Sequence, residues 1–370
     1  MLFLLILCSA ISAIACASLV RSGRRSAERY GMDMPQRFHA GHVPRLGGVA
    51  MMAACSVGWL WMAVGERHLG VMNGIQFPPQ QALAWCAAAL VAACGGTAED
   101  IWHQLRARWR LILTLTASVA AVGWLDLRVP SVGLELIDRW WVVSHWPGVL
   151  LALFAVAGLP HAFNLIDGYN GLAGAVAIIC CLALAYVALQ VGDRQLAGVV
   201  LVLAGATAGF LLWNYPRGLI FAGDGGAYLW GVVIAMAAIL LVQRHRQVSP
   251  WFPMLLLSYP VLEVSFSTYR KLVRGQSPSL ADALHIHQLI YRRIVREVFH
   301  DDEARRMLMR NNRTSPYLWS FAALTVVPAA LFWRNTYVLM AFTFGFILLY
   351  VWLYTSIVRF KVPRWIRRGR

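Results

Sequence analysis

Several polar stretches interrupt an otherwise apolar chain, and in three of them the acidic residues are the main candidates for chemistry. Glu99 and Asp100 form an adjacent pair, Asp167 stands in FNLIDGYNG, and Asp224 stands among three glycines in AGDGGAY. A carboxylate in apolar surroundings costs free energy unless it is paired, hydrated or bound to a metal. Carboxylate oxygens are also the groups with which proteins hold Mg²⁺ beside phosphates. These acids are therefore candidates for metal-assisted phosphate chemistry.

The stretch FNLIDGYNG has a regular polar spacing. Asn164, Asp167 and Asn170 recur every three residues, which on a helical turn places them along one face. Gly168 would let a ligand come close to the backbone. The alternative is a polar loop closed by an Asx turn. The position of this stretch between two apolar segments favours a ligand site.

The other two acidic stretches each have a bland alternative. In AGDGGAY, Gly223 and its neighbours would expose backbone N–H groups to an anion while Asp224 holds the metal. The alternative is a flexible glycine loop. Glu99 and Asp100 could be a carboxylate pair for metal or proton chemistry, or an acidic pair neutralised by the arginines of a solvated loop.

The stretch LADALHIHQLIYRR, residues 280–293, combines histidines with basic residues. His285 and His287 could ligate a metal, but beside Arg292 they are better suited to phosphate oxygens. A solvated amphipathic segment is the alternative. All four stretches would lie on one side of a membrane, which favours a shared function over four unrelated loops.

Composition shows which elements must position these residues. The chain has 370 residues, of which 59% are hydrophobic and 14% charged, and its mean hydropathy is +0.59. A soluble domain could not bury so much apolar surface. The seven cysteines lie in apolar stretches without the spacing of a disulfide scaffold or zinc site. Hydropathy predicts eleven spans: roughly 3–20, 46–64, 82–97, 111–125, 147–163, 171–190, 196–212, 227–243, 250–264, 316–333 and 336–358.

The distribution of basic residues predicts the orientation. Most of the 33 Lys and Arg residues fall on one side if the N-terminus is outside and the C-terminus cytoplasmic, with Arg244 and Arg246 as a local exception. The predicted fold is an all-α polytopic integral membrane protein of about 11 transmembrane helices. It comprises one membrane-embedded domain, 1–358, and a basic cytoplasmic tail, 359–370. The cytoplasmic active-site loops would be 21–45, 98–110, 164–170, 213–226 and 265–315.

The order and content of these stretches resemble the polyprenyl-phosphate N-acetylhexosamine-1-phosphate transferases, glycosyltransferase family 4. The pattern is closest to the undecaprenyl-phosphate GlcNAc-1-phosphate transferases. DMPQRFHAGHVPRLGGVA at 33–50 is similar to the N-terminal signature of the family. GTAED, NLIDGYNGLAG, GDGG and DALHIH follow in the family's order. The chain departs from the family pattern at Glu99, Asn170, Glu263 and Gln288.

The resemblance implies an enzyme that transfers N-acetylhexosamine-1-phosphate from a UDP-sugar to undecaprenyl phosphate and releases UMP. Mg²⁺ is the implied cofactor, with Mn²⁺ as its alternative. The implied catalytic residues are Glu99, Asp100, Asp167 and Asp224, with Asp224 and Asp167 as metal ligands. The implied substrate-binding residues are Asn164, Asn170, Gly223, His285, His287, Arg292, Arg37, His39 and Arg45.

The same resemblance implies a place in the cell. The protein would lie in the bacterial inner membrane with its active site facing the cytoplasm, among membrane lipids and with a homodimer as one arrangement. Its product would initiate a cell-surface polysaccharide such as O-antigen, within lipopolysaccharide and cell wall biogenesis. Nucleic acid is not an expected partner, because no recognition module accompanies the net charge of +16.

Two other classes of protein share some of these features. A transporter of lipid-linked sugars usually holds its site near the midplane of the membrane and often has repeats, whereas the acids here gather at one face. A non-catalytic relative that only binds polyprenyl phosphate would need basic groups more than three aspartates. The retention of Asp100, Asp167 and Asp224 therefore favours the enzyme.

Overall fold

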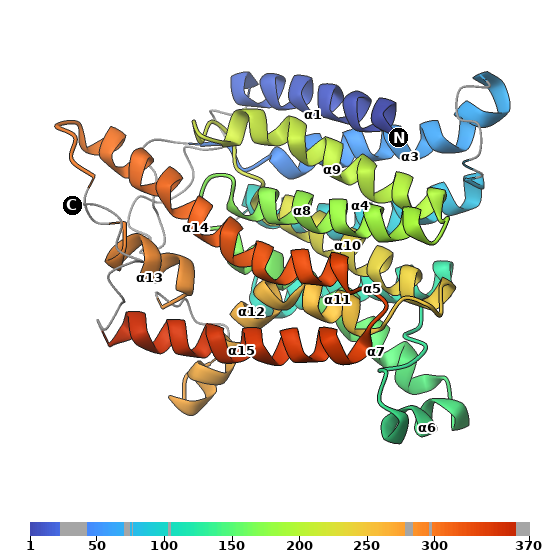
Figure 1. Cartoon of the computed structure of the whole chain (residues 1–370). Coiled ribbons are helices and arrows are strands. Elements are labelled where there is room, and N and C mark those ends of the chain that lie inside the picture. Colours follow the sequence, from blue (N-terminus) through green and yellow to red (C-terminus); the bar gives the residue numbers. More distant parts are fainter. Residues whose placement is uncertain are drawn as a thin grey trace.

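The structure of the chain is a computed structural model. It describes residues 1–22, 43–69, 75, 77–102, 105–277, 284–295 and 298–359. Within these ranges the regular secondary structure is α-helical, without a strand (Figure 1). The predicted all-α class is therefore confirmed for the part of the chain that is described. The predicted site residues Arg37 and His39 lie outside the described residues.

Eight helices are long and apolar enough to cross a membrane. They are α1 (Leu2–Ser22), α3 (Gly47–Leu69), α4 (Pro79–Trp102), α7 (Trp146–Ile166), α8 (Leu172–Gln190), α9 (Arg194–Asn214), α10 (Gly223–Arg244) and α15 (Thr336–Val358). Their length and hydropathy identify a multi-pass membrane protein, as the sequence predicts.

The three remaining predicted spans fall on helices with a different character. They are α5 (Ala107–Leu125), the pair α11 (Trp251–Leu256) and α12 (Ser258–Val273), and α14 (Glu303–Leu331). α5 opens with Arg108 and Arg110, α11 and α12 are short, and the first half of α14 is rich in charged residues. The count of eleven crossings thus stays a prediction. Two short helices, α6 (Glu135–Val143) and α13 (Ile286–Arg293), complete the described secondary structure.

The core of the molecule is α10, which is buried from Gly223 to Val242. It packs against α3, α4 and α7 through glycines that let the backbones approach closely. A Cβ added at Gly96 of α4 would collide with the backbone of Asp224, and one at Gly231 with the backbone of Pro160 in α7. Small residues at such contacts are typical of helix packing in membranes, because they increase van der Waals contact between backbones.

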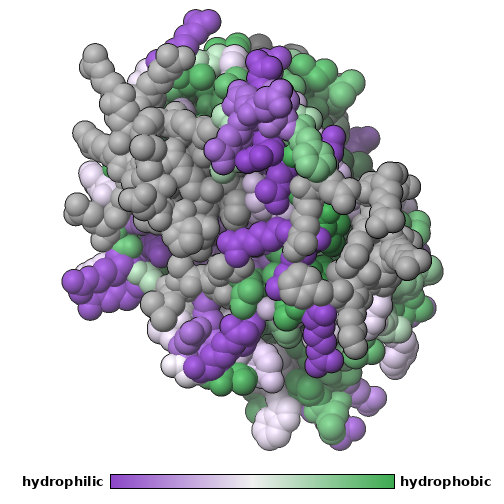
Figure 2. Space-filling view, turned by 90° about the vertical axis from the view of Figure 1, so that its left-hand side faces the viewer, coloured by the Kyte–Doolittle hydropathy of each residue, from purple (hydrophilic) through white to green (hydrophobic). Residues whose placement is uncertain are grey.

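The long helices run side by side, so the bundle has two ends (Figure 1). We call the end where α4 and α7 finish and α10 starts the site end. The opposite end, where α6 joins α5 to α7, is the α6 end. Figure 2 faces the site end, where hydrophilic side chains gather while hydrophobic ones lie mainly along the margin. The described surface at the site end is therefore mainly hydrophilic at its centre.

The α6 end contains a buried carboxylate of its own. Asp193 caps α9 by accepting a hydrogen bond from the amide of Leu196, and it also pairs with Arg244 at 3.3 Å and with His245 at 3.1 Å. Arg244 is one of the two arginines that form the local exception to the predicted topology. Its ion pair with Asp193 offsets its charge, which accounts for its presence there.

Candidate active site

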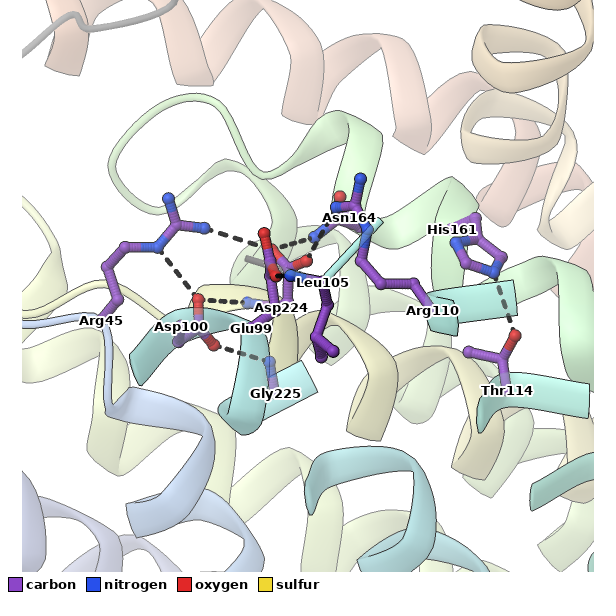
Figure 3. Close-up of polar contacts among 10 residues, drawn as sticks. All are labelled: Arg45, Glu99, Asp100, Leu105, Arg110, Thr114, His161, Asn164, Asp224 and Gly225. Carbon is purple, nitrogen blue, oxygen red and sulfur yellow. Dashed lines mark hydrogen bonds and ion pairs between the residues drawn. The ribbon is translucent and has the colours of Figure 1, made fainter. Parts of the chain in front are cut away.

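Four helices and one loop bring a compact polar cluster together at the site end (Figure 3). Asp100 comes from the last turn of α4, Asp224 from the first turn of α10 and Asn164 from the last turn of α7. Arg45 precedes α3, and Arg110 lies in the first turns of α5. These residues are up to 179 positions apart in the chain, yet they form one hydrogen-bonded group.

Asp224 is the centre of the group. Its Oδ1 accepts hydrogen bonds from Asn164 Nδ2 at 2.8 Å and from Arg45 Nη2 at 3.2 Å. Its Oδ2 accepts from Arg110 Nη1 at 3.2 Å. The carboxylate side chain is 6% exposed, whereas the two arginines are 29% and 30% exposed. An incoming anion could therefore reach the guanidinium groups, which already lie beside the buried acid.

Asp100 caps the start of α10. Its Oδ1 accepts from the amide of Asp224 and its Oδ2 from the amide of Gly225, both at 3.0 Å. A carboxylate at this position satisfies free N–H groups and interacts favourably with the helix dipole. Arg45 Nε completes the arrangement with a 3.0 Å ion pair to Asp100 Oδ1. Asp100 thus fixes the first turn of α10, and with it Asp224.

The backbone at this cap requires glycine. Gly223 has a φ of +71°, in the left-handed region that L side chains rarely adopt. A Cβ there would also collide with the carboxylate of Asp100 and the carbonyl of Arg45. At this glycine-rich stretch, α10 therefore packs closely against α4 and the segment before α3. The prediction that Gly223 binds substrate stays open beside this structural role.

Glu99 points to a different partner from its neighbour. Its Oε2 accepts a hydrogen bond from the amide of Leu105 at 2.8 Å. Consecutive residues on a helix do not face each other, so the two acids diverge although they are adjacent in the sequence. In this structure Glu99 closes the turn between α4 and α5, while Asp100 faces the cluster. The predicted catalytic role of Glu99 stays a prediction.

Asp167 ends α7, one turn after Asn164. Burial raises the pKa of its carboxyl to about 7, Arg45 opposes this effect, and the negative charges of Asp100 and Asp224 reinforce it. This mutual influence on the pKa means that Asp167 shares an electrostatic environment with the cluster. The catalytic role that the sequence predicts for Asp167 together with Asp100 and Asp224 stays a prediction.

Asn170 is bound mainly to α14. Its amide donates to Asn311 Oδ1 at 2.8 Å, its side chain donates to Asn312 Oδ1 at 3.1 Å, and its carbonyl accepts from Ser315 at 2.6 Å. The residue is 2% exposed. The three-residue spacing in FNLIDGYNG therefore does not give one continuous face, because α7 ends at Ile166 and the chain turns. Substrate binding by Asn170 stays a prediction.

The histidine stretch packs against the loop that follows α7. His285 precedes α13, and His287 lies in its first turn. A Cβ at Gly168 would be 3.1 Å from His287 Nε2, so the imidazole lies directly on this loop. Burial lowers the pKa of His287 to about 3, with a further contribution from His285. Arg292 is exposed near the end of α13.

The sequence reasoning missed two members of the site. Arg110 is one of the arginines that could neutralise the acidic pair, but in the structure it binds Asp224 directly. His161 lies on α7 one turn before Asn164, and its Nε2 is 3.0 Å from Thr114 Oγ1. The hydroxyl of Thr114 also lies within hydrogen-bond distance of the carbonyl of Leu111. The three-residue spacing from Asn164 was a signal that could have identified His161.

The donor set suits a hard metal ion that is shared with a substrate. No group of three or more His, Cys, Asp and Glu side chains forms a protein-only metal site among the described residues. Mg²⁺ commonly binds through one or two carboxylates and substrate phosphates. Asp224, with Asp167 nearby, provides such carboxylates, so the residues fit this mode of binding.

Comparison with known proteins identifies the helices that build the site. Residues 82–242 match glycosyl transferase family 4. A probable undecaprenyl-phosphate N-acetylglucosaminyl 1-phosphate transferase of Bacillus subtilis strain 168 is 26% identical over 268 residues, covering 71% of each chain. The undecaprenyl-phosphate alpha-N-acetylglucosaminyl 1-phosphate transferase of Escherichia coli K12 is 26% identical over 281 residues, covering 73% of this chain and 71% of its own. The protein of the same description from Yersinia pestis is 25% identical over 277 residues, covering 73% and 72%.

The matched segment begins at the start of α4 and ends within α10, so it contains Asp100, Asn164 and Asp224. The predicted resemblance is confirmed, and these three residues of the cluster lie in the part of the chain that is similar to glycosyl transferase family 4.

Proposed function

We propose that the protein transfers N-acetylhexosamine-1-phosphate from a UDP-sugar to undecaprenyl phosphate and releases UMP. The observation that carries the proposal is the cluster in which Asp224 joins Arg45, Arg110 and Asn164 at the ends of membrane helices. A polyprenyl tail must stay in the lipid while its phosphate meets a soluble donor, and helix ends at the membrane surface satisfy both needs. GlcNAc is the preferred sugar, since the relatives are named for it.

Mg²⁺, or Mn²⁺ in its place, would be held by Asp224 and Asp167 together with substrate phosphate oxygens. When bound, it supplies positive charge that offsets the repulsion between two anionic substrates and the charge that develops on UMP. The chain supplies further positive charge through Arg45 and Arg110. Both arginines pair with Asp224 in this structure. A guanidinium group binds phosphate oxygens in the same forked geometry with which it binds a carboxylate.

The reaction makes one phosphorus–oxygen bond and breaks another. A lipid phosphate oxygen attacks the sugar-linked phosphorus of the donor, and the bond from this phosphorus to the bridging oxygen breaks, which leaves UMP. A phosphate monoester has a second pKa of about 6, so the nucleophile needs little base near neutral pH. The contacts of Asp100 accordingly support a role in positioning Asp224 more than one in proton removal.

Other predicted residues belong to the donor side of the site. The side-chain nitrogen of Asn164 donates to Asp224, which leaves its side-chain oxygen to bind the metal or the uridine. We propose that His287 donates to the donor diphosphate as a neutral imidazole and that His285 and Arg292 assist. Arg37 and His39, which precede α3 in the sequence, are also proposed to bind phosphate.

We further propose eleven membrane crossings, with the N-terminus outside and the site end facing the cytoplasm of a bacterial inner membrane. The product would then initiate a cell-surface polysaccharide such as O-antigen. The basic residues near the site end support this orientation, because such residues are retained in the cytoplasm.

The test is to incubate purified protein with undecaprenyl phosphate, Mg²⁺ and a panel of UDP-N-acetylhexosamines, and to measure UMP with and without EDTA. We expect metal-dependent UMP release with one donor. Binding of radiolabelled undecaprenyl phosphate without UMP release from any donor would identify a non-catalytic relative. Movement of a lipid-linked sugar across proteoliposomes without UMP release would identify a transporter.

A further inference from the structure

A second buried acid lies outside the Asp224 cluster. Glu263, on α12, is 1% exposed. Its Oε1 accepts a hydrogen bond from the amide of Ile286 at 2.9 Å and lies 3.4 Å from His285 Nδ1. Its Oε2 accepts from the hydroxyl of Tyr350 in α15 at 2.9 Å. A buried carboxylate costs free energy unless such partners compensate it, and Glu263 has three from two other segments.

These contacts hold the start of α13. This helix has only eight residues, so its own hydrogen bonds give it little stability. The amide of Ile286, which begins α13, is bound to Glu263. The amide of His285 donates to the side chain of Gln288 at 3.4 Å. Glu263 of α12 thus holds the start of α13, whereas Arg310 and the carbonyls at the end of α15 bind its later residues.

His285, which Glu263 contacts, packs in turn against His287. The two imidazole rings stack with centroids 5.3 Å apart and planes 12° apart. His287 also meets the ring of Tyr169 edge-on at 5.5 Å, and its Nε2 lies on Gly168. A chain of direct contacts therefore runs from Glu263 through His285 and His287 to the loop that begins at Asp167.

The unsatisfied Nδ1 atom of His287 indicates that this side chain could bind a ligand. The residue is 3% exposed, and within the described ranges this nitrogen has no hydrogen-bond partner. Buried polar atoms of native proteins are nearly always satisfied. An imidazole whose Nε2 lies on the loop after Asp167 and whose Nδ1 is unsatisfied is suited to contact a bound substrate.

We propose that Glu263 is a positioning residue for the transfer reaction: through His285 and the amide of Ile286 it holds His287 where the imidazole contacts the bound UDP-sugar. This inference rests on the proposed function. It assigns Glu263 no contact with substrate, so its effect must disappear when His287 is absent. That requirement separates positioning from a general contribution to stability.

The test is a double-mutant cycle with Glu263→Gln and His287→Gln, each alone and together. A glutamine at 263 can still accept from Ile286 but no longer places a negative charge 3.4 Å from His285 Nδ1. We expect Glu263→Gln to raise KM for the UDP-sugar roughly tenfold, the loss typical of one charged hydrogen bond, and to leave kcat near the wild-type value. The double variant should match His287→Gln alone, because the two residues act through one contact.

Two further variants complete the test. Tyr350→Phe removes one hydrogen bond to Glu263 but leaves His285 and Ile286 bound, so it should lower the melting temperature with little change in KM. Glu263→Asp keeps the negative charge, so its KM for the UDP-sugar should lie between those of the wild type and Glu263→Gln. If Glu263→Gln does not fold, Glu263→Asp replaces it in the cycle. Additive effects of the two substitutions in active protein would overturn this inference alone, whereas a wild type without UMP release would overturn the proposed function.

Discussion

Asp224 and Asp193 are carboxylates at opposite ends of the bundle that are buried to a similar degree. Their side chains are 6% and 7% exposed, and each pairs with arginine. They differ in their neighbours, because Asp224 lies beside Asn164, Asp100 and a second arginine, whereas Asp193 is the N-cap of α9 and lies beside His245. Burial and pairing alone therefore do not identify a catalytic acid, and comparison of the two residues isolates the contribution of the site.

Replacing Asp224 with Asn should lower the rate of UMP release by about 10²- to 10³-fold, the typical loss when a group that stabilises transition-state charge is removed. The amide cannot provide the negative charge that holds a metal and both arginines. Initial rates at saturating substrate measure the effect. Asp193→Asn is the matched control and should retain activity despite a comparable loss of thermal stability. Equal activity of the two variants would argue against Asp224 as the main metal ligand.

His287 should act as a neutral hydrogen-bond donor. Burial lowers its pKa to about 3, so its protonation does not change above that pH, and raising the pH through the neutral range removes no proton from it. His287→Gln should therefore weaken substrate binding but leave the shape of the pH–rate profile unchanged between about pH 6 and pH 8. If instead a limb of the profile disappears in the variant, His287 titrates during turnover and is charged in part of this range.

The contacts of these residues could be foreseen only in part. Sequence order and hydropathy placed the three aspartates on one side of the membrane, because the ends of spans can be located from local composition. The capping of α10 by Asp100, 124 positions away, could not be derived in this way. The same holds for Asn170, which spacing assigned to a ligand face and which binds α14 across 141 positions. Long-range hydrogen bonds leave no periodic signal in a single sequence.

At the scale of elements, the site depends on how closely α4 approaches α10. Gly95 and Gly96 are adjacent on α4 but face different neighbours. A Cβ at Gly96 would collide with the backbone of Asp224 and Gly225, whereas one at Gly95 would lie 3.1 Å from the side chain of Leu113. The backbone cannot yield without moving the first turn of α10, while a side chain can shift. Sequence patterns showed both glycines inside a span but not which one touches α10.

Gly96→Ala should consequently destabilise the protein by about 3 kcal/mol, the upper range for overpacking, and should also reduce UMP release. In Gly95→Ala, the gain in helix propensity of about 1 kcal/mol should offset the adjustment of Leu113. Thermal unfolding in detergent and initial rates would measure both variants. Similar melting temperatures for the two proteins would show that α4 and α10 separate more easily than their packing indicates.

At the scale of the whole molecule, helix packing shows at which end of the bundle the first described helix starts and the last one finishes. A Cβ at Gly205 of α9 would meet Leu5, and one at Gly209 would meet Ser9, so α1 and α9 run parallel. The last turn of α15 is bound by Arg293 of α13 through the carbonyls of Ile357 and Val358. α1 therefore starts at the α6 end and α15 finishes at the site end. Hydropathy predicted the individual spans, but only the packing relates the two ends of the chain.

This arrangement predicts which surface can be labelled from outside the cell. Glu135 on α6 and Gln276 after α12 are both exposed, at the α6 end and the site end respectively. Because basic residues gather at the site end and are retained in the cytoplasm, Glu135→Cys should react with an impermeant maleimide in intact cells. Gln276→Cys should react only after the membrane is opened, with the unsubstituted chain as the background control. Labelling of Gln276→Cys in intact cells would place the Asp224 cluster outside, where no cytoplasmic UDP-sugar could reach it.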